Sequence, residues 1–178
     1  MFPKTLDQLL SIGVGIEHID GSLVEHLQGT YSLLQSWGAE PDLCMAGLYH
    51  ATYGTSGFDK HLISKNQREE VKRIIGNKVE SIVYIYCACD RNFFWPQIGT
   101  NEQPIFLDRF TRQKYHLSFQ ELQWFCELTV ANEVEIAMDN HPFITQYGLV
   151  LQDLFQRMRA YISEHAAHSV SIFNKVMA

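Results

Sequence analysis

Apolar residues recur along most of this chain at spacings of three and four, which is the pattern of amphipathic helices. Several of these stretches begin with a serine that has an acid or amide three residues later, so that the two side chains can cap a helix start reciprocally. These pairs are Ser22 with Glu25, Ser64 with Gln67, and Ser118 with Glu121. With glycine stops at Gly38, Gly54 and Gly76, the pattern predicts helices at about 4–12, 22–37, 41–53, 66–75, 77–90, 118–139 and 146–166.

The segment at about 92–117 interrupts this pattern. The aromatic residues Phe93, Phe94 and Trp95 come first, and short alternating stretches follow at 105–107 and 115–117. Such a segment is typical of a small hairpin or a long ordered loop, and exposed aromatic side chains in it leave open a lid or an interface in a homo-oligomer. Since no linker divides the chain, we expect an all-α fold: a single compact domain over 1–178, a bundle of about six to seven helices.

Four polar residues fall on the apolar faces of different predicted helices. His26 and His50 take inward positions on consecutive helices, Asp90 ends a third, and Asn132 lies within the long helix at 118–139. A buried polar group without a partner costs about 1–3 kcal/mol, so each of these side chains needs one. Either each is bonded separately to a neighbouring carbonyl or hydroxyl, or the four meet at one centre.

A shared centre would have the composition of a metal site. Imidazoles and a carboxylate are usual ligands of iron, manganese or zinc, and two histidines with one acid leave positions open for water or substrate. We therefore predict that His26, His50 and Asp90 bind a divalent metal ion, with Asp90 also serving in catalysis. His18 precedes the first of these helices and is a candidate ligand-binding residue, although a plain loop role fits it equally.

Composition limits the partners. A formal net charge of -6 with scattered basic residues disfavours nucleic acids and anionic membranes as partners. No apolar run approaches the roughly 20 residues of a membrane span, and the first residues lack the pattern of a signal peptide, so we expect a cytoplasmic protein. The cysteines form no C-x-x-C pair and lie mostly among apolar neighbours, so we expect free buried thiols rather than zinc ligands or disulfides.

An inward histidine, a second histidine ending the next helix and a later polar residue together resemble the HD superfamily of metal-dependent phosphohydrolases, whose signature is H…HD…D. The runs EHLQGTYSLLQSWG and LCMAGLYHATYGTSGF resemble more closely an uncharacterised HD-like family, as do VKRIIGNKVE, CACDR and LTVANEVE. These runs lie across about two thirds of the chain. The resemblance implies a helical HD-type domain in which His26 is the first ligand and His50 the histidine of the HD pair.

The chain departs from the HD signature at two positions. Ala51 stands where the signature has its first aspartate, and Asn132 stands where a final aspartate is expected. The loss of two negative charges weakens a site for a hard dication more than one built on neutral histidines.

Other polar residues of the matching runs are candidates for contact with a ligand. Tyr53 and Thr55, beside flexible glycines, offer hydroxyl groups to a bound small molecule. Arg91 and Arg68 are candidate catalytic cations for an anionic substrate, although an ion pair or solvated surface suits each equally.

Three functions remain open from the sequence. The first is a metal-dependent, phosphohydrolase-like hydrolase acting on a small molecule. The second is a non-catalytic domain whose degenerate HD site binds a small molecule or only stabilises the core. The third is a non-haem iron oxygenase, because two histidines and one carboxylate also suit that chemistry.

Overall fold

The computed structural model describes residues 21–57, 61–138 and 140–177, and most of these residues are helical, which confirms the all-α expectation. The helices are α2 (Gly21–Ser36), α3 (Pro41–Tyr49), α4 (Arg68–Ile75), α5 (Asn77–Ala88), α6 (Arg91–Phe94), α7 (Phe119–Ala137), α8 (His141–Arg157) and α9 (Glu164–Ser169). Short 3-10 helices are η2 (Lys65–Gln67), η3 (Trp95–Gln97) and η4 (Val170–Met177). The helix predicted at 4–12 lies outside the described residues.

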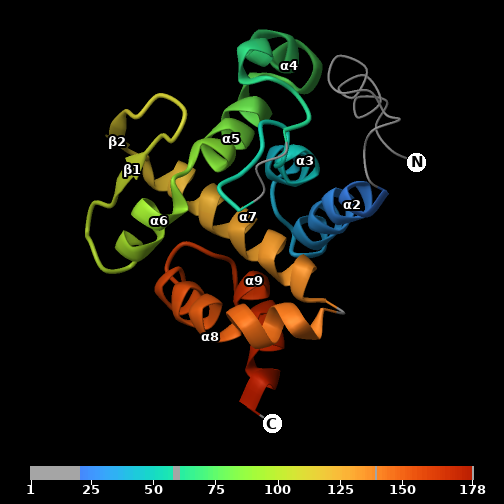
Figure 1. Cartoon of the computed structure of the whole chain (residues 1–178), viewed down its shortest axis with the longest axis vertical. Coiled ribbons are helices and arrows are strands. Elements are labelled where there is room, and N and C mark those ends of the chain that lie inside the picture. Colours follow the sequence, from blue (N-terminus) through green and yellow to red (C-terminus); the bar gives the residue numbers. More distant parts are fainter. Residues whose placement is uncertain (1–20, 58–60, 139, 178) are drawn as a thin grey trace.

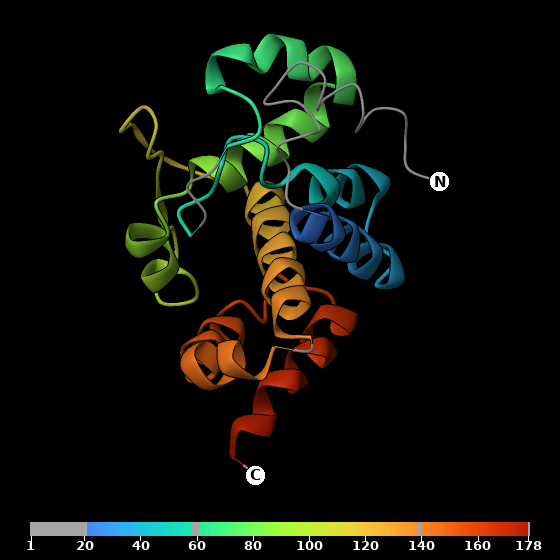
Figure 2. The same ribbon diagram turned by 45° about the vertical axis from the view of Figure 1, so that its right-hand side comes forward.

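The long helix α7 runs through the middle of the molecule (Figure 1). Helices α2, α3 and α5 pack against it, and α8, α9 and η4 pack against it from the other side (Figure 2). Because neighbours surround it, α7 is buried on most of its circumference and carries buried polar residues as well as apolar ones: Glu127, Thr129, Asn132 and Glu133. A site formed by side chains of α2, α3 and α5 is therefore also lined by α7.

Helix boundaries follow the local capping chemistry. The Ser118–Glu121 capping box is present at the start of α7, as predicted. Helix α2 instead begins at Gly21, so Ser22 lies inside its first turn. The single helix predicted at 146–166 is wrong: α8 begins earlier, after the capping residue Asn140, and the chain turns before Ser163 caps the separate helix α9.

The segment predicted as a hairpin or loop contains both a hairpin and helical turns. Strands β1 (Ile105–Leu107) and β2 (Lys114–His116) pair antiparallel, with Phe106 opposite Tyr115. The expectation that Phe93, Phe94 and Trp95 are exposed is wrong: Phe93 and Trp95 are half-buried, and Phe94 is buried. Its ring is completely buried against Phe106 and Phe125, because the hairpin folds back onto the core.

The thiols of Cys44, Cys87, Cys89 and Cys126 are free and buried, as expected. Burial raises the pKa of Cys87 to about 12, which keeps its thiol protonated at neutral pH. Among the helices of the described residues, none has the length and apolar character that crossing a membrane requires.

Candidate functional site

The structure brings His26 of α2 and His50, the residue that follows α3, together over α7. Their Nε2 atoms lie 3.2 Å apart, and the two rings meet edge to face with centroids 5.0 Å apart. Both inward stripes of the predicted helices therefore point into the same part of the core, where helices α2 and α3 pack side by side.

His50 is a buried, neutral imidazole. Its Nδ1–H donates to the carbonyl oxygen of Gly47 at 2.7 Å, which leaves the lone pair of Nε2 facing His26. Burial, together with the nearby His26, lowers the pKa of His50 to about 3. The ring is therefore in the neutral form that binds metals at neutral pH.

His26 has a carboxylate partner on its other nitrogen. Its Nδ1–H donates to Glu135 of α7, and both side chains are about one-fifth exposed, at 20% and 22%. Glu135 reaches His26 across Gly29, where an added Cβ would come within 2.6 Å of the carboxylate. The glycine thus leaves the room that this contact needs, and the carboxylate fixes the direction of the ring.

Asn132 completes the group from α7. Its Oδ1 lies 3.1 Å from Nε2 of His26, and its Nδ2 donates to Glu133 at 3.0 Å. Glu133 is buried and accepts a further hydrogen bond from Nη1 of Arg91 at 3.2 Å. Because the amide nitrogen is committed to Glu133, the oxygen of Asn132 is turned toward the two histidines.

Asp90, predicted as a metal ligand and catalytic acid, is not part of this group. Its carboxylate caps α6 by accepting a hydrogen bond from the backbone N–H of Phe93 at 3.2 Å, and it lies 3.5 Å from Arg112. The prediction failed because Asp90 follows the end of α5, where the extended Cys89 turns the chain into α6. Within the described part of the chain, no three His, Cys, Asp or Glu side chains form a metal-binding group.

Arg68 and Tyr53 are held in a separate network. The guanidinium of Arg68 donates to both carboxylate oxygens of Glu80, at 2.6 and 3.0 Å, and the Tyr53 hydroxyl donates to the same carboxylate at 3.0 Å. Glu80 is completely buried. This network ties α4 and α5 to the loop after α3, so both residues have a stabilising role, and their contact with a substrate stays a prediction.

The remaining candidates are Thr55, His18 and Arg91. Thr55 is buried in the loop after α3, and His18 lies outside the described residues. Arg91 is brought close to the centre, since Glu133 links it to Asn132. A series of side-chain contacts therefore runs from His26 through Asn132 and Glu133 to Arg91.

Sequence reasoning missed both acids of this group, Glu133 and Glu135. Acids on a helix are usually solvated, so the pattern gave no reason to place them inside. A usable signal was present, because Glu135 stands three residues after Asn132 and therefore on the same face of α7.

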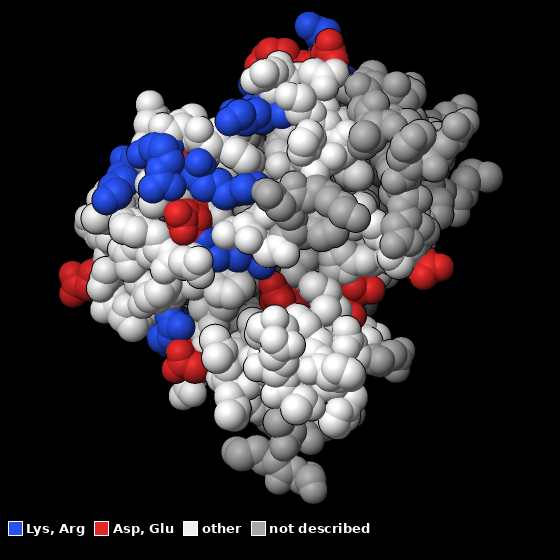
Figure 3. Space-filling view, viewed as in Figure 1, with Lys and Arg blue, Asp and Glu red and all other residues white. Residues whose placement is uncertain are grey.

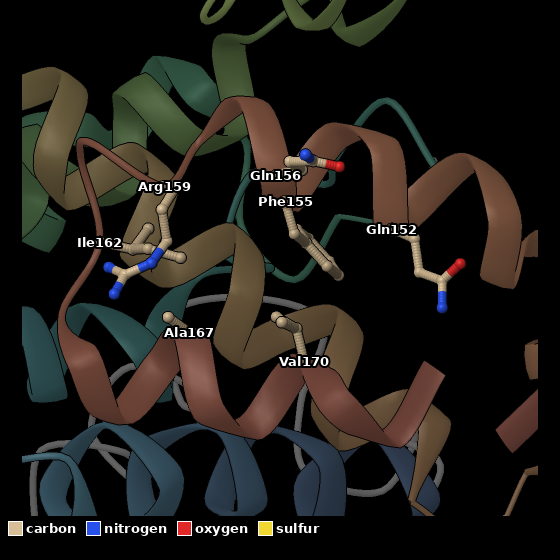
Figure 4. Close-up of a pocket in the computed structure, with 7 residues that line it drawn as sticks. All are labelled: Gln152, Phe155, Gln156, Arg159, Ile162, Ala167 and Val170. Carbon is tan, nitrogen blue, oxygen red and sulfur yellow. The ribbon is translucent and has the colours of Figure 1, made fainter. Parts of the chain in front are cut away.

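A hollow on another part of the molecule lies between α8 and the α9–η4 segment. Phe155 of α8 and Arg159, in the turn after α8, point toward Ala167 and Val170 (Figure 4). Its lining residues share no member with the histidine group, and Arg159 is paired with Glu164 on the surface. This hollow is separate from the histidine centre.

A family model described as a domain of unknown function (DUF6817) matches residues 9–91. The match includes His26, His50 and Arg91 and ends before α7, so Asn132 and Glu135 lie outside it. No curated protein and no solved structure matches the chain.

Proposed function

We propose that His26, His50 and Asn132 hold one divalent transition-metal ion and that the protein uses it to hydrolyse a small molecule. The observation that carries the proposal is the convergence of three ligand atoms. Nε2 of His26 lies 3.2 Å from Nε2 of His50 and 3.1 Å from Oδ1 of Asn132. Atoms bonded at about 2.1 Å to one metal in neighbouring positions stand about 3 Å apart.

The hydrogen bonds on the other side of each ring also support a metal site. Metal-binding histidines usually donate their second N–H to a carboxylate or a backbone carbonyl, which fixes the ring and raises its basicity. His26 donates to Glu135, and His50 donates to the carbonyl of Gly47. Each ring is therefore oriented with Nε2 toward the other.

The donor set fits some metals better than others. Two neutral imidazoles and one amide oxygen suit zinc, iron or manganese and disfavour magnesium or calcium, which require more oxygen ligands and more negative charge. A bound ion of this kind supplies a Lewis acid that makes water nucleophilic near neutral pH. Two acids orient the ligand side chains: Glu135 accepts the Nδ1–H of His26, and Glu133 accepts a hydrogen bond from the amide of Asn132.

The resemblance to the HD superfamily supports the proposed hydrolase activity. The two histidines occupy the positions that the signature assigns to ligands, and the missing aspartates at Ala51 and Asn132 leave the site with a lower charge. Three protein ligands leave coordination positions open for water and substrate.

A second function, a non-catalytic domain, is favoured by one observation. Within the described residues, every buried side-chain polar atom of the histidine group lies within hydrogen-bond distance of another polar atom, and a hydrogen on Nε2 of His26 would let that ring donate to His50 or Asn132. A group that is satisfied without a ligand can serve only to join α2, α3 and α7.

Metal content separates the two functions. Tag-free protein supplied with zinc, iron and manganese should retain close to one metal ion per chain, and His50→Ala should retain none. His165→Ala removes an exposed histidine and serves as the matched control, which should retain the metal. A folded parent that holds no metal, or a His50→Ala protein that holds as much as the parent, would contradict the proposal. Bound iron with substrate-dependent oxygen uptake would indicate the oxygenase instead.

A further inference from the structure

The indole N–H of Trp95 is an unusual group in this protein. Among the residues that the structure describes, its Nε1 is the one buried side-chain nitrogen or oxygen without a hydrogen-bond partner. Native proteins rarely leave such a donor unpaired, and a bound ligand or water commonly accounts for an exception. Trp95 begins η3, directly after α6 and four residues after Arg91.

Arg91 lies over this indole. Its guanidinium carbon is 4.9 Å from the centre of the Trp95 ring, and the side chain is 13% exposed. Nη1 donates to Glu133 and Nη2 donates to the Tyr86 hydroxyl. A guanidinium has five N–H donors, so these two bonds leave others for a ligand.

The neighbouring surface is basic, although the whole chain carries a formal charge of -6. Lys65 and Arg109 lie over the ring of Phe110, Lys114 lies over Phe93, and Arg112 lies beside Asp90. Figure 3 shows Lys and Arg side chains gathered over the hairpin and the adjacent end of α5. A basic surface around a partly buried arginine attracts anions.

A glycine borders the same arginine. An added Cβ at Gly57 would lie 3.4 Å from Nη1 of Arg91, an ordinary contact distance, so the loop after α3 runs beside the guanidinium. Arg91 is also joined to the histidine centre through Glu133 and Asn132. A group bound at Arg91 would therefore lie next to that centre.

We propose that Arg91 and Trp95 form a binding site for the oxyanion group, phosphate or carboxylate, of a small molecule. Two or more oxygens let one such group accept from the guanidinium and from the indole N–H together. The inference deepens the proposed function and rests on it in one respect: the anion is the anchor by which a substrate is held beside the metal. Binding of the anion itself requires only the side chains of Arg91 and Trp95.

Calorimetric titration of metal-free protein with inorganic phosphate, and separately with acetate, tests the site. A chelator removes the metal, and low ionic strength reduces the screening of charges by salt. The parent should bind at least one of the two anions, and the stronger one identifies the group. Trp95→Phe keeps an aromatic ring and removes the N–H, so it should bind about tenfold more weakly.

Trp124→Phe is the matched control, because the indole N–H of Trp124 donates to Glu40, away from Arg91. It should bind like the parent. Arg91→Lys, which loses the planar fork of donors, should also weaken binding and gives a second test if Trp95→Phe does not fold. A parent that binds neither anion, or a Trp95→Phe protein that binds as tightly as the parent, would overturn the inference. Metal content should be the same in the parent and in Trp95→Phe, so failure of the metal site is observed separately.

Discussion

His50 shows how a single residue can be prepared for ligand binding by its surroundings. Its ring is 2% exposed and is fixed by the hydrogen bond to Gly47, and its pKa is lowered to about 3. In the unfolded chain the same group titrates near its ordinary value of 6.5. Between these two pH values the unfolded state binds a proton that the folded state does not bind, so acidification favours unfolding.

This difference predicts a pH dependence of stability. The contribution of His50 is complete above about pH 6.5 and is lost as the pH falls toward 3. Replacement by asparagine keeps an N–H near the position of Nδ1 and removes the titration. Between about pH 6 and pH 4, the free energy of unfolding of the parent should fall by about 1.4 kcal/mol per pH unit more than that of His50→Asn. Urea unfolding measures both, and parallel pH curves for the two proteins would show that His50 is not held neutral.

Gly29 controls the carboxylate that orients His26. An added Cβ would meet Oε1 of Glu135 at 2.6 Å, and this flexible side chain would have to move away from the histidine. In Gly29→Ala, metal affinity should fall about tenfold, as for other partners of ligating histidines. The free energy of unfolding should change by no more than about 1 kcal/mol, because alanine favours the helix.

Competition with a chromophoric chelator measures the affinity of Gly29→Ala for metal. Ser32→Ala, an exposed change on the same helix, is the control and should bind like the parent. Equal affinity in Gly29→Ala and the parent would remove Glu135 from the account of the site.

At the scale of elements, hydrogen bonds to Glu80 connect α4 with α5. Its buried carboxylate accepts two hydrogen bonds from Arg68 and one from Tyr53. Glu80→Gln should lower the free energy of unfolding by about 2–3 kcal/mol, because the guanidinium loses its charged partner. Metal content should not change, since this network shares no hydrogen bond with the histidines.

Thermal and urea unfolding of Glu80→Gln measure this loss. Glu69→Gln provides the comparison, because Glu69 pairs with Lys72 on the surface and loss of this pair should leave stability nearly unchanged. Equal effects of the two substitutions would show that the buried network does not stabilise the connection between α4 and α5.

Helices with strong capping and apolar periodicity could be predicted from the sequence. The residues at which these helices end could not always be predicted. The capping box at Ser118 marks the start of α7 because its chemistry is local. Helix α3 ends at Tyr49, earlier than predicted, because the chain turns at His50 to carry Tyr53 toward Glu80. That partner lies 27 residues away, and no local pattern contains it.

At the scale of the whole molecule, α7 joins the two halves and supplies the third member of the site. The periodicity of α2 and α3 predicted that His26 and His50 point inward, and the structure places them together. The sequence could not indicate that Asp90 turns away to cap α6, or that Glu133 turns inward; for Glu135 the spacing from Asn132 was the one available signal. Those outcomes depend on how α5 and α7 are packed, which single-helix patterns do not contain.

The position of the metal tests the central claim most directly. Crystals grown with zinc and measured at the zinc absorption edge should show one anomalous peak bonded to Nε2 of His26, Nε2 of His50 and Oδ1 of Asn132, at about 2.0–2.2 Å from each. A map of the zinc-soaked protein with no peak at these three atoms, and with the two histidines still in direct contact, would contradict it.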